Sequence, residues 1–251
     1  MAHAPLILNA SLFSEIQLFE SRLHHLKYTE HNDLSWYPYG TLSNFFHLDN
    51  LLSGTYRDIG ELISNKPVLD IGCADGDLGF FIESKGYNVD FIDYAPTNYN
   101  SLKGVQRLKS ALESNASIFE IDIDSQFVLP RSYSVCFCLG LLYHLKNPFY
   151  FLEQLSKKTT FSFISTKIFQ NTSDQKNKLA HLPLAYLVDN FETNSDPTNF
   201  WIFTKKGLER LLNRSGWTII ASMSAGVTID SDPSSPDKDE RYFALLKSIH
   251  A

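Results

Sequence analysis

Apolar and polar positions follow one another along the chain in an order that predicts short strands alternating with helices. Short continuous apolar runs are typical of buried strands, and apolar residues three and four positions apart are typical of helices. From residue 67 onward the two patterns take turns. This order predicts an α/β fold built on a doubly wound, mostly parallel sheet. The expected strands are residues 68–71, 87–92, 118–121, 134–139, 158–166, 217–223 and 242–246, and the expected helices include residues 77–85, 102–112, 151–155 and 205–215.

The first 60 residues have the helical pattern alone, so we expect an N-terminal helical cap (1–60) before the main domain (61–251). One amphipathic helix covers residues 12–23 and a second apolar pattern covers residues 45–52. The loop S-W-Y-P-Y-G between them carries Tyr37 and Tyr39. Such rings offer large contact area, so they either fill the joint between cap and sheet or line a pocket that the cap closes. We favour the pocket for Tyr37 and Tyr39.

The composition of the chain argues against several classes of binding partner. The chain has 251 residues, a net charge of -6 and a pI near 5.7, which argues against a nucleic-acid partner. Its apolar runs are far shorter than the roughly 20 residues that a membrane span needs. The N-terminus lacks the basic start of a signal peptide, so a cytoplasmic location is expected. The three cysteines have no C-x-x-C spacing, which argues against zinc and disulfides, and no metal is expected.

A glycine-rich turn, V-L-D-I-G-C-A-D-G-D-L-G over residues 68–79, is the strongest motif. Gly72 and Gly76 let the backbone approach a ligand closely, and Asp70 would stand beside that ligand as a fixed negative charge. The dinucleotide pattern G-x-G-x-x-G fails here at Ala74 and Asp77. The carboxylates of this turn would also repel a pyrophosphate, so they suit a ligand with a positive centre.

This turn resembles motif I of the Rossmann-like methyltransferases that depend on S-adenosylmethionine (SAM), an acidic residue followed by G-x-G-x-G. Ala74 replaces the middle glycine. The resemblance covers residues 61–251 and implies SAM as the cofactor, a seven-stranded sheet and a closing hairpin with an antiparallel last strand. The cofactor-binding residues expected at the turn are Asp70, Gly72, Cys73, Ala74 and Gly76.

Acidic residues also stand at the ends of the next two strands. Asp93 matches a ribose diol, because one carboxylate can accept bonds from two vicinal hydroxyls, and Tyr94 would cover the adenosine. The alternative is an Asp that caps the turn before residues 95–96. The resemblance places an adenine contact after the third strand, which we assign to Asp122 and Ile123, with Asp124 as the fallback. The alternative is a solvated turn with a helix cap.

The fourth strand ends in G-L-L-Y-H-L-K-N-P, residues 140–148. Doubly wound folds place ligands and chemistry at such strand ends, so Leu139 and Gly140 are expected to contact the cofactor. This stretch again resembles the methyltransferases, including a subgroup with tRNA wobble-uridine carboxymethyl-transferring enzymes. We predict His144 as a general base and Tyr143 as the residue that orients the acceptor. The alternative is a structural His144 that bonds a loop carbonyl.

Residues 167–203 depart from the strand and helix repeat and are long for a plain connection, so we expect a functional insertion. Its end, D-P-T-N-F-W, resembles a segment of small-molecule and sugar methyltransferases, which implies that Asn199 and Trp201 face the acceptor. The alternative is a turn whose Trp anchors the insertion to the core.

Three functions follow in order of preference. The first is a SAM-dependent methyltransferase acting on an O or N of a small-molecule or biosynthetic acceptor. The second is a tRNA-modifying methyl or carboxymethyl transferase, against which the acidic pI argues. The third is a nicotinamide-dependent oxidoreductase or a SAM-binding protein without turnover. The sequence leaves the acceptor and the oligomeric state, including a homodimer, open.

Overall fold

The computed structural model describes residues 5–251, which divide into two compact units. The first unit contains the chain up to Ile123 together with Pro130–Phe137, and the second contains Asp124–Leu129 and Cys138–Ala251. Strand β4 (Tyr133–Leu139) therefore begins in the first unit and ends in the second. This division follows packing and does not coincide with residue 60, so the cap and main domain stay a prediction.

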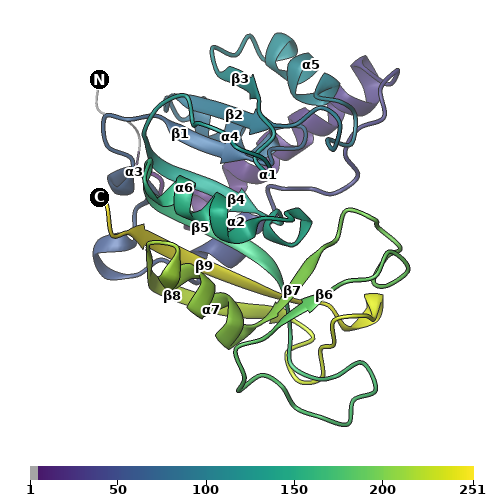
Figure 1. The fold of residues 1–251 in the computed structure, drawn as a ribbon. Helices are drawn as coiled ribbons and strands as arrows, with labels where there is room; N and C mark the ends of the chain where they lie inside the picture. The colour runs from purple at the N-terminus through teal and green to yellow at the C-terminus, as the bar shows by residue number, and fades with distance from the viewer. Residues whose placement is uncertain (1–4) are drawn as a thin grey trace. The chain divides into compact units, whose positions relative to one another are not determined.

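The first unit is a parallel sheet with helices (Figure 1). β1 pairs with β2 on one side and with β4 on the other, and β2 also pairs with β3, all in parallel. Strands β1 and β4 are buried along nearly their whole length, as expected for parallel strands covered on both faces. The elements of this unit before β4 are α1 (Ala10–His25), α2 (Asn44–Asp49), α3 (Ile59–Leu62), β1 (Val68–Ile71), α4 (Asp77–Ser84), β2 (Val89–Asp93), α5 (Lys103–Ala111) and β3 (Ser117–Glu120).

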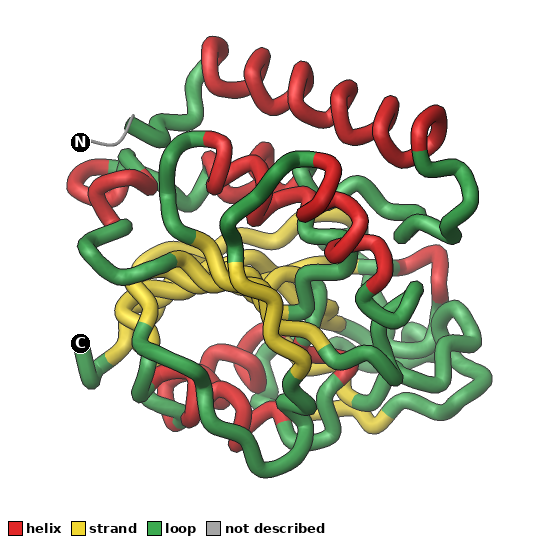
Figure 2. Tube along the Cα trace, turned by 90° about the horizontal axis from the view of Figure 1, so that it is seen from above, coloured by secondary structure: helices red, strands yellow, loops and turns green. Residues whose placement is uncertain are grey.

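Helix α1 is the long helix that follows the N-terminus in Figure 2. Asn9 caps it, because its side chain accepts a hydrogen bond from the Leu12 amide at 3.0 Å. Its apolar stripe is buried, and Phe19 meets Phe81 of α4 edge to face at 5.6 Å. A π-helical turn, Leu26–Glu30, continues the helix without a break. Such turns are rare and often mark functional sites.

The second unit contains the long strand β5 and the C-terminal antiparallel strands. β9 pairs antiparallel with β5 and with β8, and the short strand β7 pairs parallel with β5 and antiparallel with β6. Thr204 caps α7 by accepting a hydrogen bond from the Gly207 amide. The elements of this unit are α6 (Pro148–Ser156), β5 (Thr159–Phe169), β6 (Ala185–Leu187), β7 (Trp201–Thr204), α7 (Lys205–Arg214), β8 (Trp217–Gly226) and β9 (Glu240–Ser248).

The predicted α/β fold with a mostly parallel sheet and an antiparallel last strand is confirmed. The strand order is β3-β2-β1-β4-β5-β7-β6, with β9 beside β5 and β8 beside β9. The sheet has nine strands where seven were expected. Of the two additional strands, β6 lies inside the expected insertion 167–203, and β7 begins inside it and ends one residue beyond it. β5 itself continues to Phe169.

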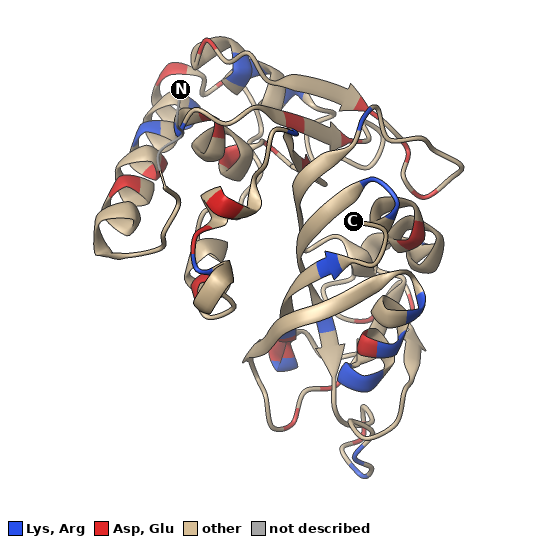
Figure 3. Ribbon diagram, turned by 90° about the vertical axis from the view of Figure 1, so that its left-hand side faces the viewer, with Lys and Arg blue, Asp and Glu red and all other residues tan. Residues whose placement is uncertain are grey.

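Charged residues of both signs occur in each unit (Figure 3). Within residues 5–251, no helix is long and apolar enough to cross a membrane. All three cysteines are buried. Cys136 and Cys138 lie on β4, one residue apart, so they share a face of that strand.

Candidate active site

The backbone of the glycine-rich turn is left-handed at every second residue. Gly72, Ala74 and Gly76 have φ angles of 67°, 53° and 85°. Glycine adopts this region at no steric cost, whereas an alanine there is strained by roughly 1–2 kcal/mol. The turn is closed by two backbone hydrogen bonds of 2.8 Å, from the Gly72 amide to the Ile92 carbonyl and from the Gly76 amide to the Cys73 carbonyl. Ala74 thus occupies a position that favours glycine.

Asp93, at the end of β2, is bonded directly to this turn. Its Oδ2 accepts hydrogen bonds from the Ala74 amide and the Asn98 side chain, both at 3.0 Å. Its Oδ1 accepts one from the Tyr94 amide at 2.8 Å. Cys73 Sγ lies 3.9 Å from the same carboxylate. A carboxylate has about four acceptor positions, so these three hydrogen bonds leave Asp93 the capacity for one further donor.

Asp70 lies buried at the end of β1, below the start of α4. Its carboxylate accepts a hydrogen bond from the Gly79 amide at 3.1 Å. Burial, together with the neighbouring Asp93 and Asp77, raises the pKa of Asp70 to about 7, although the Gly79 hydrogen bond acts in the opposite direction. With this pKa the carboxyl group carries only part of a negative charge at neutral pH, which is less than the sequence predicts.

The other two acidic residues of the turn are paired inside the protein. Lys27, from the π-helical turn, places Nζ 3.1 Å from Asp75 Oδ2 and 2.8 Å from Asp77 Oδ1. All three side chains are buried. Lys27 therefore offsets part of the negative charge that the sequence predicts to suit a ligand with a positive centre.

Tyr37 and Tyr39 lie together in the loop after the π-helical turn. Their ring centroids are 5.4 Å apart, and Tyr37 also meets Tyr99 at 6.0 Å. The Tyr37 amide donates to Asp75 Oδ2 at 2.9 Å, which fixes this loop against the glycine-rich turn. Tyr37 is half-buried, while Tyr39 is 68% exposed. Tyr94 is half-buried next to Asp93.

The residues predicted to hold adenine follow β3 and differ in their burial. Ile123 is buried and Asp122 is half-buried. Asp124 accepts hydrogen bonds from the Lys146 and Asn147 amides at 2.9 and 2.8 Å, in the turn that leads into α6. The Asp124 side chain therefore ties the segment after β3 to the turn before α6.

At the end of β4, Leu139 is half-buried, and Gly140 has a φ of 73° and donates its amide to Ser165 Oγ at 2.9 Å. A Cβ on Gly140 would lie 3.8 Å from both Tyr143 Oη and Arg241 Nη1, so it would be in ordinary van der Waals contact with both side chains. Arg241 lies 5.7 Å from the centre of the Tyr143 ring. Burial raises the pKa of the Tyr143 phenol, while hydrogen bonding to Arg241 opposes that rise.

His144 belongs to a chain of polar groups that ends at a carboxylate. Its Nδ1 lies 3.1 Å from the Thr198 carbonyl and 2.9 Å from Thr198 Oγ1. Thr198 Oγ1 donates its proton to Asp196 at 2.6 Å, so Nδ1 must be the donor toward Thr198. The lone pair of the neutral ring is then on Nε2. Burial lowers the pKa of His144 below 6.5, against the hydrogen bond to Thr198 and the nearby Asp196.

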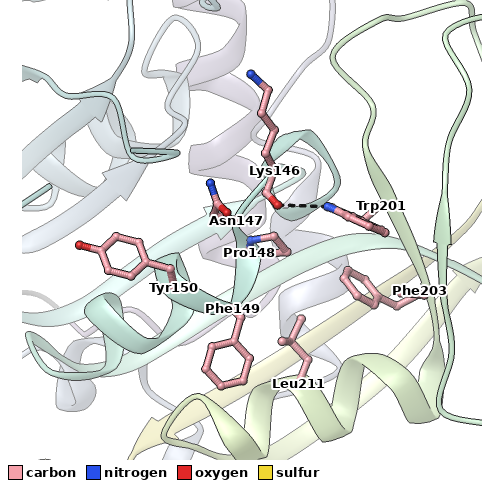
Figure 4. Close-up of a pocket in the computed structure, with 9 residues that line it drawn as sticks. Lys146, Asn147, Pro148, Phe149, Tyr150, Trp201, Phe203 and Leu211 are labelled. Atoms are coloured by element: carbon pink, nitrogen blue, oxygen red, sulfur yellow. Dashed lines mark hydrogen bonds between the residues drawn. The ribbon is translucent and has the colours of Figure 1, made fainter. Parts of the chain in front are cut away.

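Asn199 and Trp201 differ in their surroundings. Asn199 is buried and donates to Thr193 Oγ1 at 2.9 Å, but its Oδ1 has no hydrogen-bond partner among residues 5–251. Trp201 begins β7, and its indole N–H donates to the Lys146 carbonyl at 3.2 Å (Figure 4). It lines an apolar hollow of about 420 Å³ with Pro148, Phe203 and neighbouring residues. The hydrogen bond to Lys146 is the anchoring contact that the alternative interpretation requires.

Sequence reasoning missed three residues that organise the turn. Asn98 bridges Asp93 and the Ala74 carbonyl, Asn100 donates to Asp75 Oδ1 at 2.7 Å, and Lys27 pairs with Asp75 and Asp77. The N-x-N spacing after residues 95–97 offered a weak signal, because Asn is common in turns that bond their own backbone. Lys27 offered none, since it is separated from Asp75 by 48 residues.

Comparison with known protein families shows to which family the chain belongs. The model of a methyltransferase domain family matches residues 47–222, which include the glycine-rich turn, Asp93 and the end of β4. The chain belongs to this methyltransferase domain family. The fold and the motif resemblance therefore agree with the family assignment.

Individual relatives are distant. A mitochondrial ubiquinone biosynthesis O-methyltransferase of Schizosaccharomyces pombe is 26% identical over 129 residues, which are 49% of this chain and 46% of that protein. The chain thus matches about half the length of this curated relative. A methyltransferase structure from Bacillus halodurans covers 82% of this chain and 98% of its own, with 11% identity and a TM-score of 0.56. The N-terminal domain of EvdMO1, solved with S-adenosylhomocysteine (SAH), covers 96% and 98%, with 13% identity and a TM-score of 0.52.

Proposed function

We propose that this chain is a SAM-dependent methyltransferase that methylates an oxygen or nitrogen of a small-molecule acceptor. The observation that carries the proposal is the bond network in which Asp93, at the end of β2, fixes the left-handed turn after β1 through the Ala74 amide. This is the place where doubly wound folds bind nucleosides. The family assignment makes the nucleoside SAM.

The described residues of the first unit fit an adenosyl group. The turn offers a backbone with small residues at 72, 74 and 76. Asp93 has the capacity for one ribose hydroxyl without any change, and for the second if Asn98 releases Oδ2. Asp122 and Ile123 are proposed for adenine, and Tyr94 for the face of the adenosine. Lys27 offsets one negative charge of the acidic turn, and the remaining carboxylates suit a sulfonium.

When bound, SAM supplies a methyl group that its sulfonium has already made electrophilic. The chain has to align the acceptor and remove its proton. We assign proton removal to His144, because burial keeps the ring neutral and the Thr198 contact leaves the lone pair on Nε2. Tyr143, held by Arg241, and Asn199 Oδ1, which lacks a partner among the described residues, are proposed to orient the acceptor.

A small-molecule acceptor is supported by two observations. The similar Schizosaccharomyces pombe protein is an O-methyltransferase of ubiquinone biosynthesis. The net charge of -6 disfavours the phosphate contacts that dominate nucleic-acid binding. The same proposal includes a biosynthetic role in the cytoplasm. It also includes acceptor contacts by Tyr37, Tyr39 and Trp201. The formation of a homodimer is left to solution measurements.

Titration calorimetry tests this function without knowledge of the acceptor. SAH should bind the wild-type chain and NAD should not. Asp93→Ala removes charged hydrogen-bond acceptors and should weaken SAH binding roughly 100-fold. Asp33→Ala, which removes an exposed carboxylate paired with Arg107, is the matched control and should bind SAH normally. Binding of NAD in place of SAH would refute the proposal.

A further inference from the structure

Lys27 is a buried cation in an unusual backbone. Only 5% of its surface is exposed, and it lies in the π-helical turn that follows α1. Its Nζ contacts the carboxylates of Asp75 and Asp77 and lies 5.5 Å from the centre of the Trp36 ring. Burying a lysine is costly unless its charge is paired. Both partners belong to the glycine-rich turn and the first residue of α4, so the pairing joins the N-terminal segment to the candidate SAM site.

Asp75 connects this pairing to the loops around the site. Its Oδ2 accepts from Lys27 Nζ at 3.1 Å and from the Tyr37 amide at 2.9 Å, and its Oδ1 accepts from Asn100 Nδ2 at 2.7 Å. Gly104 makes the approach of this carboxylate sterically feasible, because a Cβ there would lie only 2.0 Å from Asp75 Oδ1. One side chain thus fixes three segments that are distant in sequence.

Without Lys27, this part of the molecule would hold a strong excess of negative charge. Asp70, Asp75, Asp77 and Asp93 influence one another electrostatically, and Glu20 of α1 also acts on Asp77. Removing one partner of a buried ion pair leaves an uncompensated charge. The carboxylates of Asp75 and Asp77 would then repel each other, and the turn that carries Ala74 and Gly76 would move.

We propose that Lys27 is a positioning residue for SAM binding, which holds the glycine-rich turn in its binding geometry by pairing with Asp75 and Asp77 and offsetting part of their negative charge. This inference rests on the proposed function. It makes the N-terminal helical segment a structural part of the cofactor site. Lys27 acts through the turn and does not itself contact the nucleoside.

A second lysine provides a matched control. Lys85, just after α4, pairs with Glu15 of α1, so it joins the same two helices as an ion pair whose glutamate is half exposed. It also packs over the Phe81 ring at 5.0 Å. Both of these Lys85 contacts lie outside the glycine-rich turn. Replacing it therefore removes a cation and a link to α1 without altering the charge at the turn.

The test is SAH titration calorimetry on the full chain, with circular dichroism to verify that each variant is folded at the titration temperature. Lys27→Met should weaken SAH binding roughly 10- to 100-fold, because the loss of charged hydrogen bonds displaces the turn. Lys85→Met should change the affinity less than about 3-fold. The double variant Lys27→Met with Asp77→Asn removes the excess charge and should recover most of the affinity.

Recovered SAH affinity in the double variant would show that Lys27 acts through its charge and not through its packing, since the double variant still lacks the lysine side chain. A folded Lys27→Met protein with wild-type SAH affinity would overturn the inference and leave the proposed function intact. Wild-type protein that fails to bind SAH would overturn both. If Lys27→Met does not fold, the SAH affinity of the double variant is the test. An affinity close to that of the wild-type protein supports the inference, and an affinity about 50-fold weaker than wild type overturns the inference.

Discussion

The glycine-rich turn of the first unit and the Tyr143–His144 segment of the second unit solve different physical problems. In the turn, carboxylates are held by backbone amides, two asparagines and Lys27. In the second segment, burial keeps an imidazole neutral, and a single relay through Thr198 fixes its orientation. The turn is thus suited to holding a polar group in one geometry, and the histidine segment is suited to accepting a proton.

The comparison also shows where each region keeps unused capacity. Asp93 has room for one more donor, and Asn199 Oδ1 has no partner within the described chain. Buried polar atoms without partners cost free energy, so they are natural contact points for a ligand. Substitutions in the two regions should therefore affect different measurements.

The largest effect is expected from His144→Ala. Loss of a general base should slow methylation of any acceptor that the wild-type protein methylates roughly 100- to 10,000-fold, while SAH affinity stays within about 3-fold. Thr198→Val removes the hydroxyl but keeps the carbonyl that orients Nδ1, so its turnover should fall far less.

Because the pKa of His144 lies below 6.5, wild-type turnover should persist to more acidic pH than an ordinary histidine allows. Steady-state assays of SAH release measure both, and normal turnover in His144→Ala would exclude the histidine from the reaction.

A smaller effect, confined to the turn, is expected from Asp70→Asn. The pKa of Asp70 is raised by burial to about 7 in the folded chain, above its ordinary value of 3.8. The folded state then binds the proton more tightly than the unfolded state, so stability is highest at low pH and is lost as pH rises through about 7. Asp70 should lower the wild-type free energy of unfolding by roughly 3 kcal/mol between about pH 5 and about pH 8.

Urea unfolding over this pH range measures the Asp70 effect. Asparagine keeps an oxygen that can accept the Gly79 hydrogen bond but does not ionise, so this part of the pH dependence should disappear in Asp70→Asn. Equal pH dependence in the two proteins would show that Asp70 is already ionised at low pH.

The smallest effect is expected from Ala74→Gly. The φ of 53° at this position strains an alanine, while glycine loses more chain entropy on folding. The substitution should therefore raise the free energy of unfolding by at most about 1 kcal/mol. Glu113→Gly, at a φ of 53° outside the turn, is the control for the backbone effect. Thermal unfolding checks the stabilisation, and a clear loss of stability in Ala74→Gly would contradict the strain at this position.

Local patterns were sufficient to predict the parallel core and its motif. The apolar run before Gly72, the helix that begins at Asp77 and the helix over residues 205–214 all depend on residues near one another in sequence. Strands β6 and β7 were missed because they are three and four residues long and are stabilised by pairing with each other and with β5. A turn-rich composition conceals such short strands.

The charge of the turn could not be predicted for a different reason. The sequence shows the carboxylates of Asp75 and Asp77 but not the ammonium group that reaches them from 48 and 50 residues away. Likewise, the burial that raises the pKa of Asp70 depends on the packed sheet. Pairing and burial are properties of the fold, so charge counts within a motif mislead when a distant residue supplies the counter-charge.

The most direct test of the account is a crystal structure of the chain with SAH. We expect the ribose hydroxyls on the Asp93 carboxylate, with Asn98 displaced from Oδ2 if both hydroxyls bind, and the Lys27 contacts to Asp75 and Asp77 unchanged. A nucleoside bound elsewhere, with the Asp93 carboxylate still held only by Ala74, Tyr94 and Asn98, would contradict the central claim.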